Sequence, residues 1–258
     1  MTSSASKIIS LILFALTFLL HGQISSGTEN NTAPSERITF EVKWSFITAG
    51  EATLEFFPDE SLENERANRY LFKARTNKYV DMIYKVRDSI ESYTDISLTH
   101  SLLYKKSHRA GSSKDIAVAF DWSDNSARYS MNGNSIDPIT VDINTFDPLS
   151  VFFAFRKNLP DKDNDLRIKL TDGKRYITAV ARMIKKEKIK IAGKVYDTVL
   201  VEPEMEGVSG VFKKEKKARL KIWVTDDRHR IPVRIKSKVA VGSFTASLIA
   251  YEGNYDAE

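Results

Sequence analysis

Apolar and polar residues alternate with a period of two along most of the chain. The first such run has its apolar positions at Ile38, Phe40, Val42 and Trp44. This alternation is typical of a strand with one buried and one solvent-facing side. Roughly a dozen segments of this kind recur at spacings of about 8 to 15 residues. The pattern predicts a mainly β fold, an antiparallel curved sheet that forms a half-barrel or closes into a barrel.

Turn-forming residues separate several of the predicted strands. Asn132-Gly133 offers two residues that tolerate a positive φ, which a two-residue hairpin turn requires. Asp172-Gly173 and Ala192-Gly193 provide comparable positions between alternating runs. We therefore expect neighbouring strands to pair as antiparallel hairpins.

One segment interrupts the alternation. Asp147 is a residue type that caps helix N-termini, Pro148 suits the first helical position, and Pro160 ends the run. The apolar residues of the segment cover an arc of roughly 200° on a helical projection. We predict one inserted helix over residues 147–159, which is buried on more than one side or faces an apolar ligand. Residues 79–84 are candidates for a short helical turn.

The N-terminal residues differ in composition from the remainder. Lys7 precedes an apolar run that is too short to span a bilayer comfortably, and small residues follow it. We interpret residues 1–26 as a secretory signal peptide, with an uncleaved N-terminal anchor as the alternative. Residues 27–35 are polar and predict a disordered lead-in. Residues 36–258 contain no internal repeat or linker, and we expect a single β-rich domain there.

The chain contains no cysteine. Disulfides, thiol catalysis, cysteine-based metal sites and lipidation of a cysteine after the signal are therefore excluded. A domain of this length buries enough surface to fold without disulfides. Exported chains without cysteine are common in the bacterial periplasm, where we expect this protein to reside.

Positive charge is concentrated in the C-terminal part of the chain. The net charge is +5, and residues 161–258 hold 22 Lys and Arg against 15 Asp and Glu. Two lysine-rich runs, 185–190 and 213–217, lie in this part. An exported protein with such a basic half is expected to contact anionic lipid, lipopolysaccharide or an acidic glycan, including peripheral contact with a membrane, rather than nucleic acid. A solvated surface is the alternative interpretation of both runs.

Four segments carry a resemblance that extends over nearly all of residues 36–258. They are the first strand with Ala49-Gly50-Glu51, the run Val86-Arg87-Asp88 to Glu91-Ser92, Asp147-Pro148-Leu149-Ser150 with Arg156, and Ile222–Asp227 leading to Ile231-Pro232-Val233. In this order and spacing they resemble an uncharacterised bacterial envelope family, domain-of-unknown-function family 3108 (DUF3108). The resemblance implies a secreted β-rich domain and no established reaction. In architecture the chain is also similar to the open-barrel lipoprotein carriers of the periplasm.

Motifs that would indicate catalysis or metal binding are weak. Gly207-Val208-Ser209-Gly210 lacks the spacing of a hydrolase nucleophile elbow. His229 lies beside Asp226 and Asp227, where a solvated hairpin tip is a simpler interpretation than a metal site. Spacing along the chain cannot place two carboxylates across a hydrolytic cleft. The carboxylates considered for that role are Asp88, Glu91, Asp137, Asp142 and Asp147. We predict no catalytic residue, no metal site and no cofactor.

Binding is better supported than catalysis. A guanidinium among apolar neighbours needs an anionic partner, either an internal carboxylate or the head group of an acidic lipid. Arg156 has such surroundings on the predicted helix. Aromatic residues of the helix and of the predicted strands either line a cavity or fill a core. The candidate ligand-binding residues are Arg156, Phe152, Phe155, Trp44, Trp122 and Phe120.

The leading hypothesis is a secreted, periplasmic, non-catalytic β-domain that binds an amphiphile or an anionic envelope component such as lipid, lipoprotein or lipopolysaccharide. In this hypothesis the curved sheet holds the ligand and the helix acts as a plug or lid. Two alternatives stay open. One is an envelope hydrolase that uses carboxylates in the cavity, and the other is an assembly factor for an outer-membrane partner.

Overall fold

The computed structural model describes residues 33–110, 112–160, 165–206, 219–238 and 242–253. The predicted signal peptide and most of the predicted lead-in lie outside these residues. Ser35 already bonds to the sheet, because its N–H donates to the Phe56 carbonyl at 2.9 Å. Within the described residues, no helix has both the length and the apolar character needed to cross a membrane.

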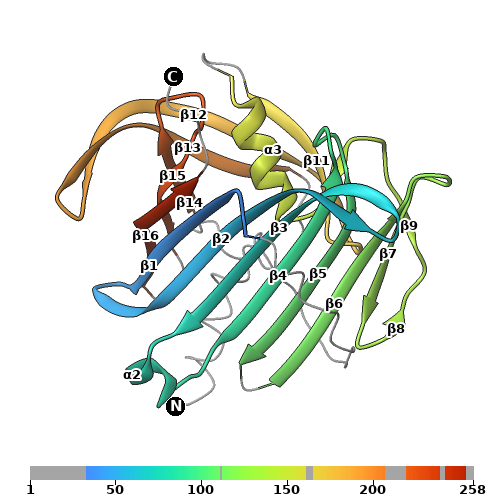
Figure 1. The fold of residues 1–258 in the computed structure, drawn as a ribbon, viewed down its shortest axis with the longest axis horizontal. Coiled ribbons are helices and arrows are strands. Elements are labelled where there is room, and N and C mark those ends of the chain that lie inside the picture. Colours follow the sequence, from blue (N-terminus) through green and yellow to red (C-terminus); the bar gives the residue numbers. More distant parts are fainter. Residues whose placement is uncertain (1–32, 111, 161–164, 207–218, 239–241, 254–258) are drawn as a thin grey trace.

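Most of the described chain belongs to one 16-stranded sheet, and two helices accompany it (Figure 1). The strands are β1 (Glu36–Trp44), β2 (Ile47–Leu62), β3 (Glu65–Thr76), β4 (Arg87–Asp95), β5 (Ser101–Ala110), β6 (Ser112–Asp121), β7 (Ser126–Met131), β8 (Asn134–Ser135), β9 (Ile139–Thr140), β10 (Thr145–Phe146), β11 (Leu166–Thr171), β12 (Tyr176–Ile191), β13 (Lys194–Glu206), β14 (Arg219–Thr225), β15 (Pro232–Lys238) and β16 (Ser243–Gly253). The helices are α2 (Lys78–Asp81) and α3 (Ser150–Asn158).

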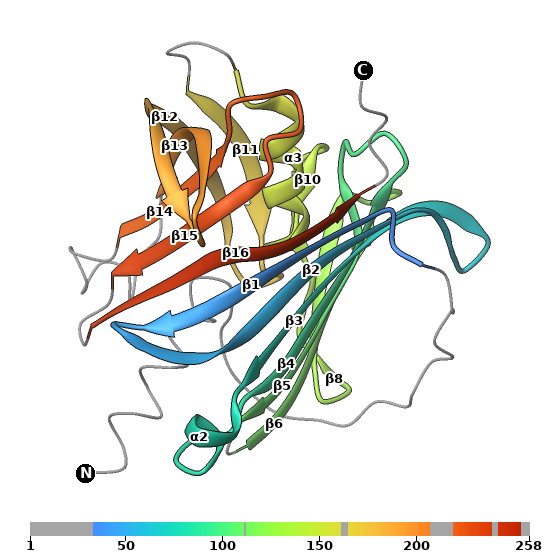
Figure 2. The same cartoon turned by 60° about the vertical axis from the view of Figure 1, so that its left-hand side comes forward.

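The first strand of the domain occupies the middle of the sheet. The order is β10-β11-β12-β13-β14-β15-β16-β1-β2-β3-β4-β5-β6-β7-β8, and β9 pairs with β7. β1 is antiparallel to both β16 and β2, so it joins the last strand of the chain to the N-terminal half of the sheet. β10 and β11 are parallel. The sheet curls round on itself and stays open between its two edges (Figure 2).

The predicted fold class is confirmed, since the structure is a curved antiparallel sheet with an inserted helix. The number of strands is higher than the predicted dozen. Three of the additional strands, β8, β9 and β10, have only two residues each. A two-residue strand has no apolar–polar alternation, and its place in the sheet is set by its neighbours rather than by its own sequence.

The predicted helix exists but is shorter than 147–159. α3 begins at Ser150, with Leu149 as its N-cap residue, and it ends before Leu159, whose ψ of 118° is not helical. Pro148 and Leu149 form a turn instead of the first helical turn. The prediction of a single helix is also corrected, because α2 forms a second one that overlaps the candidate segment 79–84. Asn77 Oδ1 caps α2 by accepting bonds from the N–H groups of Tyr79 and Val80.

Two of the predicted tight turns have the backbone that their residues favour. Asn132 and Gly133 have φ of 57° and 80°, and Ala192 and Gly193 have φ of 47° and 87°. The first pair joins β7 to β8 and the second joins β12 to β13. Ala192 is a residue that rarely takes a positive φ, and here the hairpin imposes it.

Alternation along the strands builds the core on the inner face of the curl. In β4 every second residue from Asp88 to Thr94 is buried. The main core cluster draws buried residues from strands of both halves of the sheet and from the region of α3. Its members include Ile38, Phe40, Leu54, Tyr70, Ile90, Tyr104, Val118, Tyr129, Leu149, Phe153 and Leu248.

Gly50 gives a test of how closely β2 and β3 pack. A Cβ at this position would lie 2.0 Å from the carbonyl oxygen of Arg75, which is far inside contact distance. We expect Gly50→Ala to lower the free energy of unfolding by about 3 kcal/mol or more, because backbone must move to admit one methyl group. Denaturant unfolding followed by circular dichroism measures the change.

Gly193→Ala is the matched control. Gly193 has a φ of 87° but no heavy atom within 4 Å of its would-be Cβ, so the substitution carries only backbone strain of about 1–2 kcal/mol. Equal losses of stability in the two variants would contradict the close approach of β2 and β3.

Candidate functional site

Helix α3 fills the hollow of the curled sheet. Phe153 of the helix is buried, and the centroids of its ring and the Tyr70 ring lie 4.1 Å apart. Phe56 stacks on Tyr70 at 5.1 Å, so rings from α3, β2 and β3 are in direct contact. The turn between β11 and β12 also reaches the inner face, where a Cβ at Gly173 would lie 2.9 Å from the Cβ of Tyr129. Side chains and this turn therefore occupy the space beside the helix.

The guanidinium of Arg156 is bound within the molecule. Its Nη1 and Nη2 donate to the two carboxylate oxygens of Glu36, both at 2.8 Å. Its Nε donates to the Arg230 carbonyl at 3.2 Å, and Nη2 also donates to the His229 carbonyl at 3.1 Å. The side chains of Arg156 and Glu36 are only 8% and 3% exposed. Of the two partners that the sequence left open, the internal carboxylate is the one present.

The other predicted ligand-binding residues fall into two groups. Those that border the main core cluster are Phe152, Phe120 and Trp122. Phe155 packs against two smaller clusters instead. Trp44 stacks on Phe244, with ring centroids 6.3 Å apart, at the far end of β1. The structure thus brings three of the five aromatic residues to one core, and their role in ligand binding stays a prediction.

Asp147 ties the start of α3 to the sheet. Its carboxylate is fully buried and accepts hydrogen bonds of 2.5 to 2.7 Å from the hydroxyls of Ser92, Ser101 and Ser150. It also accepts from the N–H groups of Leu149 and Ser150 at 2.8 and 3.0 Å. Asp147 thus binds the backbone N–H groups at the start of α3, although Leu149 and not Asp147 is the N-cap residue of the helix, and the two serines from β4 and β5 were not predicted. Five donors occupy the carboxylate, which leaves it poorly suited to hydrolysis.

An inner polar cluster, made of Asp88, Lys106 and His108, lies on the inner face of β4 and β5. His108 Nδ1 is 2.7 Å from Asp88 Oδ1, and the other oxygen of Asp88 is buried without a hydrogen-bond partner. Lys106 is 5% exposed, and burial lowers the pKa of its ammonium group to about 7, although Asp88 opposes the shift. A lysine that exchanges its proton near neutrality beside a carboxylate and an imidazole is chemically able to transfer protons.

Asp88 was a candidate carboxylate in the sequence, but its grouping with His108 and Lys106 was not predicted. The alternation of β5 held the signal, because Tyr104, Lys106 and His108 share one face of the strand and Tyr104 is a core residue. Across the described residues, no group of three or more His, Cys, Asp or Glu side chains is arranged to hold a metal ion.

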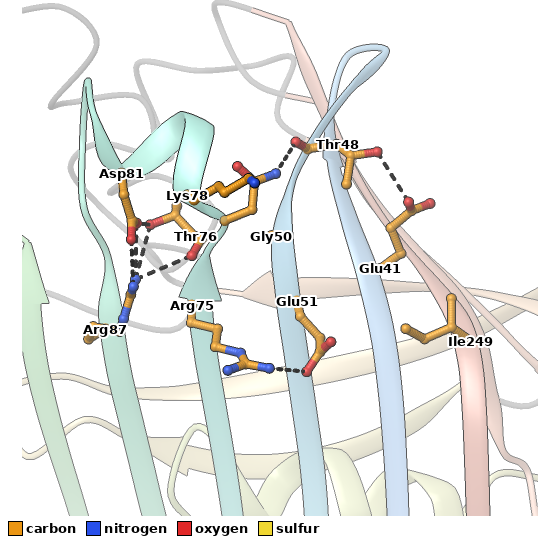
Figure 3. Close-up of a pocket in the computed structure, with 11 residues that line it drawn as sticks. Glu41, Thr48, Gly50, Glu51, Arg75, Thr76, Lys78, Asp81, Arg87 and Ile249 are labelled. Carbon is orange, nitrogen blue, oxygen red and sulfur yellow. Dashed lines mark hydrogen bonds and ion pairs between the residues drawn. The ribbon is translucent and has the colours of Figure 1, made fainter.

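A groove lies on the outer face of the sheet, between α2 and the start of β2 (Figure 3). Its volume is about 570 Å³. The lining residues are Glu41, Thr48, Gly50, Glu51, Arg75, Thr76, Asn77, Lys78, Asp81, Arg87 and Ile249. Arg75 donates to Glu51 at 3.2 Å and Arg87 donates to Asp81 at 2.6 Å, so positive and negative charges offset one another. Two of the charged pairs that line the groove are therefore satisfied within the protein.

A row of lysines crosses the outer face near the same end of the sheet. Direct cross-strand partners share a face, and the register places Lys43 opposite Thr245, Thr245 opposite Lys236, and Lys236 opposite Lys221. We call Lys43, Lys236 and Lys221 the basic row. Lys43 pairs with Glu41 at 2.9 Å and Lys221 with Glu202 at 3.0 Å. Lys236 is exposed and has no ion pair within the described part of the chain.

The two lysine-rich runs of the sequence have different outcomes. The run 185–190 lies on β12, and its lysines are exposed. Three of them pair with carboxylates, namely Lys185 with Glu187, Lys186 with Asp226 and Lys188 with Asp197. The run 213–217 lies outside the described residues.

Comparison with known proteins agrees with the resemblance found in the sequence. The family model described as protein of unknown function (DUF3108) matches residues 39–249. The chain belongs to this family. Segments that suggested DUF3108 meet in the structure, since Ser92 bonds to Asp147, and Gly50 and Arg87 line the outer groove. A search of curated proteins finds no match.

The DUF3108 chain also has a structural neighbour. It is similar to the crystal structure of a beta-barrel-like protein of domain of unknown function DUF1849 from Brucella abortus, with a TM-score of 0.56 and 10% sequence identity. The match covers 87% of this chain and 99% of the neighbour. At this identity the likeness shows the fold alone.

Breaking the Arg156–Glu36 pair tests the role that the structure gives to Arg156. We expect Arg156→Leu to lower the free energy of unfolding by about 3–5 kcal/mol, because a buried carboxylate loses its partner. Adding Glu36→Gln should restore part of that loss, since the uncompensated charge disappears. A double-mutant cycle from denaturant unfolding gives the coupling. Additive losses in the double variant would contradict the pairing.

Lys106 predicts a pH dependence of stability. Its pKa is about 7 in the folded protein and near 10.5 in the unfolded chain, so the unfolded state binds more protons between these values. The contribution of Lys106 to stability therefore rises from pH 7 toward pH 10.5, and its penalty is fully present below pH 7. Lys106→Met should raise the free energy of unfolding at pH 7 by roughly 1–4 kcal/mol and flatten the slope between pH 7 and 9.

The exposed neighbour Lys105 provides the control. Lys105→Met removes the same charge from the solvent-facing side of β5 and should leave the pH slope unchanged. Unfolding at a series of pH values measures both variants. The same slope in Lys106→Met as in the wild type would show that Lys106 is not the buried, neutralised group described above.

Proposed function

We propose that this protein is an exported, periplasmic, non-catalytic β-domain that binds an anionic envelope component at its surface. The component is the anionic head-group layer of a lipid or lipopolysaccharide membrane. The observation that carries the proposal is the basic row on the outer face of the sheet. The fold supplies a rigid surface for such binding, because the row is fixed by the register of β14, β15, β16 and β1.

The basic row costs stability. Lys236 lies directly opposite Lys221, and like charges in that position repel each other. Glu202 pairs with Lys221, whereas Lys236 is exposed and has no ion-pair partner among the described residues. An anionic surface would supply a counter-charge for Lys236 and would also attract the other two lysines of the row, with about 1 kcal/mol for each lysine near it.

The packing of the interior favours binding at the surface over binding of a lipid beside α3. Phe153 and Tyr70 are in contact in the hollow of the sheet, and Arg156 is held by Glu36. A ligand there would have to displace a buried ion pair and aromatic contacts, and both displacements are costly. No such displacement is needed at the basic row, which already faces solvent.

Vesicle binding tests the proposal. The purified protein should co-sediment with phosphatidylcholine vesicles that contain phosphatidylglycerol, less with pure phosphatidylcholine, and more weakly as salt is raised. Lys236→Glu should weaken this binding roughly 30-fold, because reversing one charge removes two units of attraction. The same substitution should raise the thermal midpoint, since it replaces the repulsion from Lys221 by an attraction.

Lys105→Glu is the control for charge alone. It makes the same change on the solvent-facing side of β5, outside the basic row, and should bind vesicles nearly as well as the wild type. If both variants lose binding equally, general charge rather than the basic row is responsible. If the wild type ignores anionic vesicles and instead binds an outer-membrane protein, the assembly alternative replaces the proposal.

A further inference from the structure

One end of the sheet carries a cluster of exposed apolar side chains. Within the described residues, Phe46 is 90% exposed, Met82 82% and Ile83 83%. Tyr79 and Ile47 are 67% and 53% exposed. Ordinary surfaces scatter single apolar residues, whereas these five large ones share two neighbouring loops. We call Phe46, Ile47, Tyr79, Met82 and Ile83 the apolar rim.

Hydrogen bonds hold the two loops of the apolar rim together. Phe46 and Ile47 lie at the turn between β1 and β2, and the other three lie in or just after α2. The N–H of Asn77, the N-cap of α2, donates to the Ala49 carbonyl at 2.9 Å, and its side chain donates to the Thr48 carbonyl at 2.6 Å. Both loops project at the same end of the sheet in Figures 2 and 3.

Two exposed lysines flank the α2 part of the apolar rim, and the carboxylate of α2 is paired. Lys78 and Lys85 are exposed, and the Lys78 ammonium lies 5.0 Å from the centre of the Tyr79 ring. Asp81 accepts bonds from Arg87 at 2.6 and 3.1 Å, so the one carboxylate of α2 carries an internal counter-charge. Exposed apolar side chains next to exposed lysines match a lipid membrane, in which an anionic head-group layer covers apolar acyl chains.

We propose that the apolar rim inserts into the interfacial layer of an anionic lipid bilayer while the basic row lies at the head groups. This rests on the proposed function and names the part of the molecule that enters the membrane. Lys43 lies three residues before Phe46, and the turn at Ser45 and Phe46, where Ser45 has a φ of 56°, keeps the distance between them below about 10 Å. The head-group layer on each side of a bilayer is about 5–8 Å thick. The basic row thus lies at head-group height when the Phe46 side chain reaches the acyl chains.

The absence of cysteine makes the insertion directly measurable. Single substitutions Phe46→Cys and Met82→Cys each give one labelling position for an environment-sensitive fluorophore. With vesicles that contain phosphatidylglycerol, both labels should shift to shorter wavelength and be quenched by spin-labelled acyl chains. Ile143→Cys is the matched control, because Ile143 is 67% exposed but lies between β9 and β10, outside the apolar rim. Its label should stay in water.

Affinity gives a second readout. Phe46→Ser and Ile83→Ser should each weaken binding to the same vesicles about tenfold, with little change in thermal stability, because both side chains are exposed in the free protein. The loss should persist at high salt, unlike the loss in Lys236→Glu. Ile143→Ser should bind like the wild type.

Each other outcome overturns the inference in a recognisable way. If vesicle binding is salt-dependent and the two rim labels stay in water, the apolar rim does not insert, while the proposed function stands. If the wild type binds no vesicles, both fail. If the rim labels shift without vesicles as protein concentration rises, the apolar rim is instead a contact between two copies of the chain.

Discussion

The bidentate bond between Arg156 and Glu36 is the contact on which the arrangement of the interior depends. It joins residues 120 positions apart and links the last turns of α3 to the start of β1. β1 is the strand that connects the two halves of the sheet. Because both groups are almost fully buried, either one alone would be an uncompensated charge in an apolar interior. The pair therefore fixes the helix to the middle of an open sheet.

Asp147 fixes the other end of α3 to the sheet. With both ends attached, the helix stays over the apolar inner face even though the sheet does not close into a barrel. A curled sheet leaves an apolar inner face that something must cover. Here α3 and the turn before β12 cover it, so that the rings of Phe153 and Tyr70 meet where a carrier would hold its ligand. The exposed groups that a partner could contact therefore lie on the outer face of the sheet and at the apolar rim.

Much of the fold was predictable because alternation directly reports which side of a strand is buried. The inserted helix was also predictable, since Pro148 and Pro160 bound one apolar run. Its exact start was not, because Asp147 is held by Ser92 and Ser101 from other strands, and a turn at Pro148 and Leu149 follows it before α3 begins. Side-chain partners across the sheet depend on register, which a single sequence does not contain. For this reason the partner of Arg156, the inner polar cluster and the basic row all required the structure.

The contacts beside α3 indicate an interior that is filled by the protein's own side chains without a ligand. Native mass spectrometry of the gently purified protein tests this most directly. We expect the mass of the protein alone, with no lipid that survives removal of weakly attached molecules. A stoichiometric lipid of defined mass, retained after such removal, would contradict the filled interior and return the helix to the role of a lid.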